Sequence, residues 1–195
     1  MKISTPTDFS PVVHYDGNPK VFDFTKGYDP DYILTIPFGI GRYNEKRKDM
    51  YISTIYNNCR NVHIGVDFWM AAGADVFSFY DGSILFFRDN ANHRDYGPTI
   101  ITEHLLDGAP IYALYGHLSR ESLDNIHEGQ KIRKGEKIGE IGNEEENGGW
   151  APHLHFQLSR VKPPEPDMPG VVAEEDLPEA LQIYPDPQLV LGKLY

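Results

Sequence analysis

Short apolar stretches recur along the chain, and several alternate hydrophobic and polar positions with the period of two that is typical of half-buried β-strands. Asp81-Gly82 separates two of these stretches, and this dipeptide predicts a hairpin in which Gly82 supplies a positive φ. Asp107-Gly108 separates the next pair in the same way. We therefore expect an all-β sheet or sandwich, with strands at 33–36, 62–68, 76–80, 83–87, 98–104, 111–118 and 153–158, and further short strands within 129–139.

Two short helices are expected in addition, at 119–125 and 174–182. Residues 162–170 contain four prolines and cannot form a helix or a central strand. The pattern divides the chain into an N-terminal extension at 1–34, a main domain at 35–160, and a Pro-rich linker and C-terminal tail at 161–195. The tail is expected to pack on the flank of the core, and we predict no chemistry in it.

The composition excludes several functions. The 195 residues include 18 Lys+Arg and 29 Asp+Glu, for a net charge of −11, so we expect no nucleic-acid partner. No stretch of 18 apolar residues is present, so membrane insertion is not expected. No apolar run follows Lys2, which predicts a cytoplasmic location, or a periplasmic or secreted one if a leader has been removed. The single cysteine, Cys59, excludes an internal disulfide and is expected to be a small buried residue.

The candidate chemistry lies in three patterns among the eight histidines. Residues 63–67 read His-Ile-Gly-Val-Asp, so that on a strand His63 and Asp67 share one face. His153 and His155 are likewise separated by one residue and share a face, and His117 follows Tyr115-Gly116 at the end of an apolar strand. Each pattern alone is weak evidence, but together, on β segments, they indicate a metal site.

A catalytic zinc ion uses three protein ligands and keeps one position open for water. Two neutral histidines and one aspartate would provide such a set, and the bound water would ionise near neutral pH. The five candidates exceed these three ligands, and the two remaining histidines would carry protons or stabilise the transition state. Other architectures are excluded, because the sequence has no His-Glu-x-x-His, no Cys-x-x-Cys and no Gly-x-Ser-x-Gly.

At these residues the chain resembles the lysostaphin/LytM-type zinc metalloendopeptidases, most of which cut peptidoglycan cross-bridges. The family pattern is H-x-G-x-D, then a strand ending in Y-x-H-L, then H-L-H-F, and all three parts are present. Glycine-containing turns also match, and the resemblance covers about residues 35–160. It implies a curved antiparallel sheet of the duplicated hybrid motif type.

The resemblance also implies roles for individual residues. His63, Asp67 and His155 would be the ligands of one zinc ion per chain, and His117 and His153 would be catalytic. The loop at 143–152 would form a wall of the substrate groove, where Trp150 is a candidate platform for substrate or a packing residue. Tyr43 and Tyr115 are candidates for an additional hydrogen-bond donor in the groove.

These inferences predict a zinc-dependent endopeptidase that hydrolyses a peptide or a peptidoglycan-derived substrate. Two alternatives stay open. One is a catalytically inactive regulatory or binding module of the same fold, and the other is a cytoplasmic zinc hydrolase that acts on a different small amide. The scissile bond and the oligomeric state cannot be inferred from the sequence.

Overall fold

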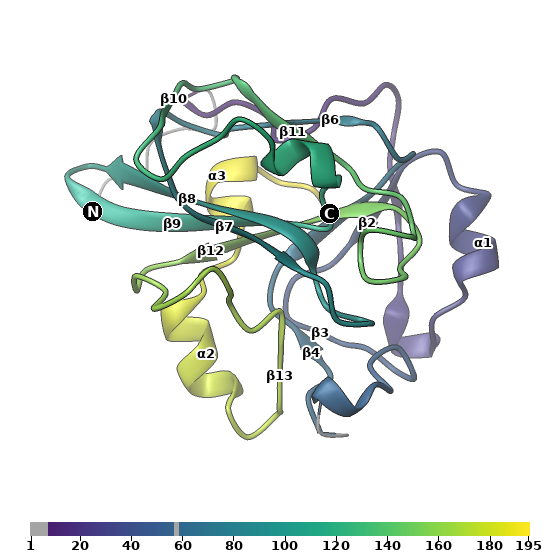
Figure 1. Ribbon diagram of the computed structural model, residues 1–195. Coiled ribbons are helices and arrows are strands. Elements are labelled where there is room, and N and C mark those ends of the chain that lie inside the picture. The colour runs from purple at the N-terminus through teal and green to yellow at the C-terminus, as the bar shows by residue number, and fades with distance from the viewer. Residues whose placement is uncertain (1–7, 57–58) are drawn as a thin grey trace.

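The computed structural model of the protein describes residues 8–56 and 59–195 (Figure 1). Its central feature is an eight-stranded sheet in the order β1-β2-β5-β12-β9-β8-β7-β10, in which only the β1–β2 pair is parallel. In chain order, its strands are β1 (Lys20–Val21), β2 (Gly39–Gly41), β5 (Val66–Trp69), β7 (Gly82–Asn90), β8 (Gly97–Leu106), β9 (Ala109–Gly116), β10 (Lys131–Ile132) and β12 (His153–Ser159).

Two smaller sheets lie on either side of the central one (Figure 1). One pairs β6 with β11, and the other has the order β13-β4-β3. The largest apolar cluster contains Ile40, Val66 and Phe156 from the central sheet together with Val76 of β6. It therefore fills the space between the central sheet and the β6–β11 sheet. The remaining strands are β3 (Glu45–Lys46), β4 (Val62–His63), β6 (Asp75–Phe77), β11 (Lys137–Glu140) and β13 (Val171–Val172).

Helices form a small part of the structure. The α-helices are α1 (Pro30–Leu34), α2 (Leu177–Ile183) and α3 (Gln188–Leu191), and short 3-10 helices cover Phe24–Lys26, Thr54–Tyr56 and Arg120–Leu123. The helices expected at 119–125 and 174–182 are therefore present in shorter form. The prediction of a mostly β fold with a minor helical part is confirmed.

The two turns predicted from Asp-Gly pairs have different outcomes. Asp107 and Gly108 connect β8 to β9 with φ of 51° and 80°, as expected for a tight hairpin. The hairpin predicted around Gly82 is wrong, because β6 pairs with β11 while β7 pairs with β8 and β10. Gly82 is instead required by close packing, since a Cβ there would lie 2.4 Å from the carbonyl oxygen of Glu103.

The strand predicted at 33–36 is also wrong, because the chain forms α1 there. The Asp29 side chain accepts a hydrogen bond from the backbone N–H of Tyr32 at 3.0 Å, and Pro30 occupies the first turn. An N-cap aspartate followed by proline is a helix-start signal. It outweighs the β-branched residues that follow.

The N- and C-terminal segments are integrated with the central sheet. Val12 and Val13 belong to the main apolar cluster, β1 extends the sheet, and Val190 of α3 packs into the same cluster. The boundaries at 34/35 and 160/161 stay predictions. Cys59, expected to be buried, is exposed.

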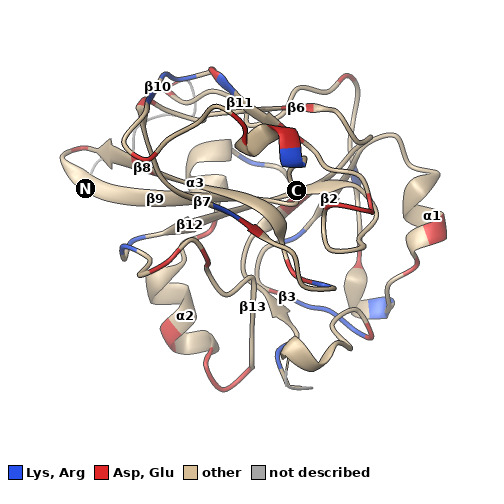
Figure 2. Ribbon diagram, in the orientation of Figure 1, with Lys and Arg blue, Asp and Glu red and all other residues tan. Residues whose placement is uncertain are grey.

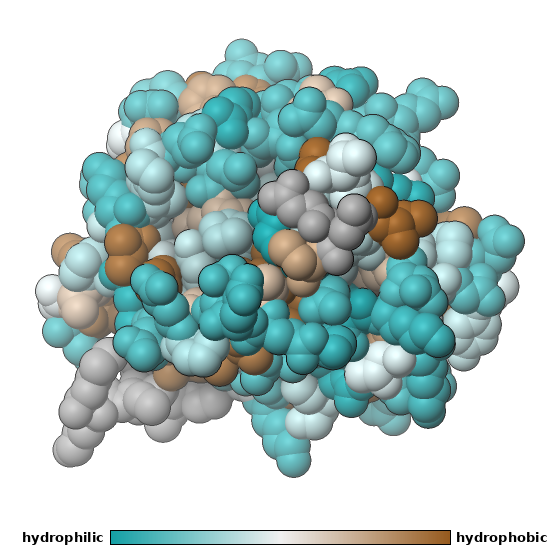
Figure 3. Space-filling view, turned by 90° about the horizontal axis from the view of Figure 1, so that it is seen from below, coloured by the Kyte–Doolittle hydropathy of each residue, from teal (hydrophilic) through white to brown (hydrophobic). Residues whose placement is uncertain are grey.

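Basic and acidic residues are interspersed along the ribbon (Figure 2). Seen from the side of β3, β4 and α2, the surface is mostly hydrophilic, with scattered hydrophobic residues (Figure 3). Within the described residues, no helix has the length and apolar character needed to cross a membrane.

His104 on β8 makes stability depend on pH. Its Nδ1 donates to the carbonyl oxygen of Asp81 at 3.0 Å, its Nε2 accepts from the Thr102 hydroxyl at 2.7 Å, and burial lowers its pKa to about 4. In the unfolded chain the pKa is ~6.5, so between these values the unfolded state binds more protons. Stability is thus expected to fall as the pH falls from ~6.5 toward 4.

We expect His104→Gln to reduce the loss of unfolding free energy between pH 7 and pH 4.5 by up to ~3 kcal/mol. The reason is that the variant has no buried imidazole that must stay unprotonated in the folded state. Urea unfolding at pH 7 and pH 4.5, with a chelator present, measures the effect. His127→Gln at an exposed position is the matched control. An unchanged pH dependence in His104→Gln would contradict this assignment.

Candidate metal centre

The three predicted ligands lie where two sheets meet. His63 ends β4, Asp67 lies in β5, and the register of β5 with β12 places His155 opposite Asp67. His63 and Asp67 were expected on one strand, but the chain leaves one sheet after His63 and enters the other at Val66. Gly65 is needed at this crossing, because a Cβ there would lie 2.5 Å from Cε1 of His155.

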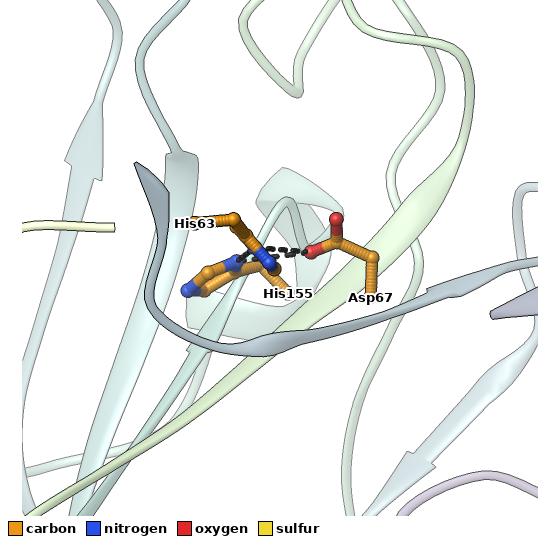
Figure 4. A group of neighbouring side chains, drawn as sticks. All are labelled: His63, Asp67 and His155. Carbon is orange, nitrogen blue, oxygen red and sulfur yellow. Dashed lines mark hydrogen bonds and ion pairs between the residues drawn. The ribbon is translucent and has the colours of Figure 1, made fainter. Parts of the chain in front are cut away.

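One atom from each side chain points to a common position (Figure 4). His63 Nε2 lies 3.1 Å from Asp67 Oδ1, His155 Nδ1 lies 3.0 Å from the same oxygen, and the two nitrogens are 3.0 Å apart. All three residues are buried. The side chains are thus brought together from β4, β5 and β12 within a distance that one ion can span.

The surrounding hydrogen bonds indicate which ring nitrogens carry hydrogen. The backbone carbonyl oxygen of Arg42 lies 2.9 Å from His63 Nδ1 and can accept its proton. The Gln157 side chain donates to the carbonyl oxygen of Pro169, so its own Oε1 faces His155 Nε2 at 3.0 Å and accepts from it. When the proton of His63 is on Nδ1, these partners leave the lone pairs of His63 Nε2 and His155 Nδ1 directed toward Asp67 Oδ1.

In this tautomer the three facing atoms are all acceptors, and they repel one another unless a cation lies between them. Two imidazole nitrogens and one carboxylate oxygen form the donor set of a catalytic zinc site, and outward N–H bonds to a carbonyl or amide are its usual support. The residues present therefore fit zinc.

The electrostatic environment gives these groups suitable protonation states. Burial, together with the nearby Arg47, lowers the pKa of His63 to about 4. Burial opposes ionisation of Asp67, but His63 and Arg47 hold the pKa of its carboxyl well below the usual value. At neutral pH the imidazole is neutral and the carboxylate is charged, as metal ligation requires.

His117 and His153 lie beside this cluster, with ring centroids 4.2 Å apart. His117 Nδ1 donates to the carbonyl oxygen of Asn147 at 2.9 Å, and His153 Nδ1 donates to that of Ala151 at 2.8 Å. Because carbonyl oxygens only accept, both rings carry hydrogen on Nδ1 and keep Nε2 as a free acceptor. Burial lowers the pKa of His153 to about 4 and that of His117 well below 6.5.

A cavity of about 230 Å³ connects these groups to the surface. All five predicted histidine and aspartate residues line it, and so does Trp150, whose ring is covered by the Arg94 guanidinium at 4.4 Å. Trp150 is itself buried, and its role as a substrate platform stays a prediction.

The two other groove candidates lie elsewhere. Tyr115 is fully buried in the main apolar cluster, where its ring packs on Phe156 and its hydroxyl accepts from the Phe79 N–H. The Tyr43 hydroxyl donates to the carbonyl oxygen of Tyr184 at 2.6 Å. Neither residue lines the cavity, in contrast to the expectation from sequence. The position of Tyr115 near the end of β9 did not reveal that its ring would point into the apolar core and not into the cavity.

Sequence reasoning missed the wall formed by residues 167–171, which belong to the segment expected to have no chemistry. The Ile64 N–H donates to the Gly170 carbonyl at 2.8 Å, and β13 pairs with β4 beside His63. Tyr96, also missed, lines the cavity and donates from its hydroxyl to the Met168 carbonyl at 3.1 Å. In the sequence, Gly170 is the residue that could have indicated this contact, since a Cβ there would lie 2.2 Å from the Tyr96 hydroxyl oxygen.

Asp167 in the same wall has a pKa raised to about 6 by burial and by the nearby Asp95. Both residues line the cavity, as do Arg60 and Arg94. The cavity therefore presents charges of both signs beyond the five central residues.

A mostly β domain with a buried His-Asp-His cluster and two further histidines at one cavity has the groups that a metal-dependent hydrolase requires. The model of the family described as Peptidase family M23 matches residues 61–166, more than half of the chain, and the chain belongs to this family of metallopeptidases. The predicted family resemblance and enzyme class are therefore confirmed, whereas the roles of individual residues stay predictions.

Several known proteins are similar to this chain. Peptidoglycan DD-endopeptidase ShyA of Vibrio cholerae is 34% identical over 96 residues, which are 49% of this chain but only 20% of ShyA. Among solved structures, the catalytic domain of lysostaphin from Staphylococcus simulans has a TM-score of 0.49 at 22% identity, covering 78% of this chain and 98% of that one. A zinc-containing peptidase from Vibrio cholerae has a TM-score of 0.44 at 29% identity, covering 60% and 31%.

Proposed function

We propose that this protein is a zinc-dependent endopeptidase that hydrolyses peptide bonds in peptidoglycan or in peptides derived from it. One observation carries the proposal: possible ligand atoms of His63, Asp67 and His155 converge, and two further histidines line the same cavity. The relation to a peptidoglycan endopeptidase over 96 residues supports the substrate class.

His63, Asp67 and His155 would hold the zinc ion. When bound, zinc supplies a Lewis acid for a peptide carbonyl and lowers the pKa of a water molecule. The protein itself fixes the three ligand atoms, keeps Asp67 ionised and encloses the site in buried side chains.

His117 and His153 would move the protons. In the tautomers that these hydrogen bonds require, both Nε2 atoms are acceptors, so either ring can take a proton from the attacking water. Once protonated, that ring becomes a donor and can pass the proton to the leaving amine. Because burial disfavours the charged ring, it would release this proton readily. A donor role toward the oxyanion requires prior protonation of the ring concerned.

The charges in the cavity also fit a peptide substrate. Arg60 and Arg94 can meet carboxylates, and Asp95 and Asp167 can meet an ammonium group. A zwitterionic peptide with both groups suits this lining better than a uniformly charged polymer. The free energy of such contacts would be used to orient the scissile bond.

We expect the zinc-loaded chain to convert cross-linked muropeptides into smaller products with new amino termini. Purified sacculi and defined soluble muropeptides are incubated with the protein, and the products are identified by chromatography and mass spectrometry. Chelation should abolish the reaction and zinc should restore it, because the metal supplies the Lewis acid. His127→Ala, at an exposed position, is the control variant.

The outcomes separate the candidate functions. Cleavage of soluble muropeptides but not of sacculi would restrict the substrate to fragments. A zinc-loaded chain that cleaves neither would contradict the proposed substrate and leave a binding module or a hydrolase of another amide.

A further inference from the structure

Arg47 is the buried cation of the candidate metal centre, with 2% of its surface exposed. Its Nη1 donates to Asp67 Oδ2 at 2.7 Å and to the Tyr51 hydroxyl at 2.9 Å. Its Nη2 lies 2.9 Å from His63 Nδ1, and its Nε donates to Glu45 Oε2 at 3.3 Å. One guanidinium therefore contacts two of the three proposed ligands on the sides that face away from the metal position.

The chain makes room for this side chain. Gly41 of β2 lies against it, and a Cβ at Gly41 would be 2.7 Å from Arg47 Nη2 and 3.0 Å from Asp67 Oδ2. In the charged run at 45–48, Lys46 and Lys48 are exposed, whereas Glu45 and Arg47 are buried. The inward direction of Arg47 thus follows the alternation of strand β3 and its continuation.

His63 Nδ1 faces two groups with opposite requirements. The Arg42 carbonyl oxygen needs a proton on Nδ1, whereas Arg47 Nη2 can only donate and needs a lone pair there. In the first tautomer Nε2 is free for a metal. In the second, Nε2 carries the hydrogen and donates to Asp67 Oδ1 at 3.1 Å, which closes the site without a metal.

We propose that Arg47 is a positioning residue that acts as a stand-in cation: it balances the Asp67 charge and holds the ligands together while no metal is bound. This inference rests on the proposed metal site. According to this proposal, Arg47 contributes more to the stability of the metal-free protein than to the stability of the zinc-loaded protein. In the loaded protein its donation to His63 is lost and its positive charge lies close to that of the ion.

The effect of removing Arg47 follows from this asymmetry. Without the guanidinium, metal-free Asp67 is a buried carboxylate with no full positive charge beside it, and such a change is strongly destabilising. A bound zinc ion would again place a positive charge beside the Asp67 carboxylate. The metal-free protein is therefore expected to lose more stability than the zinc-loaded protein, and zinc is expected to bind the variant more tightly.

The test compares wild type with Arg47→Met, which keeps a linear apolar side chain without the charge. Thermal denaturation is measured in chelator and in saturating zinc, and zinc affinity is measured by competition with a chromophoric chelator. We expect the melting temperature of Arg47→Met to fall much more in chelator than in zinc, and its zinc dissociation constant to decrease roughly tenfold. Arg47→Lys, which keeps the charge, should largely restore wild-type behaviour.

Arg42→Met is the matched control, because the Arg42 side chain contacts Glu45 and Asp23 but neither Asp67 nor His63. Arg42→Met should lower the melting temperature by the same amount in chelator and in saturating zinc. If Arg47→Met unfolds only when zinc is removed, that also supports the proposal.

Two results would overturn it: equal losses of melting temperature in both conditions, or weaker zinc binding by Arg47→Met. Either would make Arg47 an ordinary support of Asp67. If wild type binds no zinc, the metal site itself fails, and this result is distinguishable from both.

Discussion

Replacing His63, Asp67 or His155 with alanine is expected to remove zinc from the protein and hydrolysis with it. Each substitution leaves two of three converging ligand atoms, so the tetrahedral set with one open position is no longer complete. Loss of a supporting hydrogen-bond partner alone costs roughly 10–100-fold in metal affinity, and loss of a ligand should cost more. Wild type should bind close to one zinc per chain.

Metal content after dialysis is measured by elemental analysis, and zinc affinity by competition. Asp67→Asn is an informative companion, because it preserves shape but removes the closer of the two carboxylates that contact the buried Arg47, leaving Glu45 Oε2 at 3.3 Å. Its metal-free form should be less stable than wild type, by at most about 3–5 kcal/mol, because Glu45 still compensates part of the Arg47 charge.

The two histidines of β12 provide the sharpest check on the ligand assignment. His155 Nδ1 points to Asp67, whereas His153 stacks on Trp69 at a centroid distance of 3.9 Å. Zinc loss in His153→Ala with retention in His155→Ala would mean that these two roles are assigned the wrong way round.

The four longest strands (β7, β8, β9 and β12) and the histidine patterns were predictable because they depend on local sequence. The alternation at 153–158 follows directly from the pleat of β12, and it places His153 and His155 on one face. The β8–β9 turn likewise depends on two adjacent residues, Asp107 and Gly108. Such features require no knowledge of distant partners.

Other features depend on packing between segments far apart in the chain. β6 and β7 look like two halves of a hairpin, but each pairs with a strand that comes later in the sequence. The wall at 167–171 is similar: its prolines exclude regular structure but do not reveal that the segment lies beside His63. Arg47 stands in a short charged run, and its burial requires the space that Gly41 leaves on strand β2.

The groove tyrosines show the same limit. Tyr115 precedes His117 by two residues, so proximity in sequence suggested proximity in the site. The backbone of His117 has a φ of 63°, which turns the chain at the end of β9 and separates the directions of the two side chains. Tyr96 lies in the connection between β7 and β8, and its ring packs beside the rings of His117 and His155.

His117→Ala and His153→Ala are expected to keep zinc near the wild-type level while lowering the rate of peptide hydrolysis by about 10²–10⁴-fold each. Both rings lie outside the His63-Asp67-His155 set, so the ligand atoms remain. The loss falls on proton transfer and transition-state stabilisation. Because both rings serve one transition state, the double variant should lose less than the product of the two single losses.

The pH dependence of the rate provides an independent readout for this pair. A general base must be neutral, and burial holds the pKa of His153 at about 4 and that of His117 well below 6.5. The acid limb of wild type is therefore expected below the value of an exposed imidazole, ~6.5. Rates are measured on a substrate whose cleavage has been verified, with zinc content determined in parallel. Full activity of His117→Ala with zinc bound would show that its imidazole takes no part in the reaction, even if the metal site is correct.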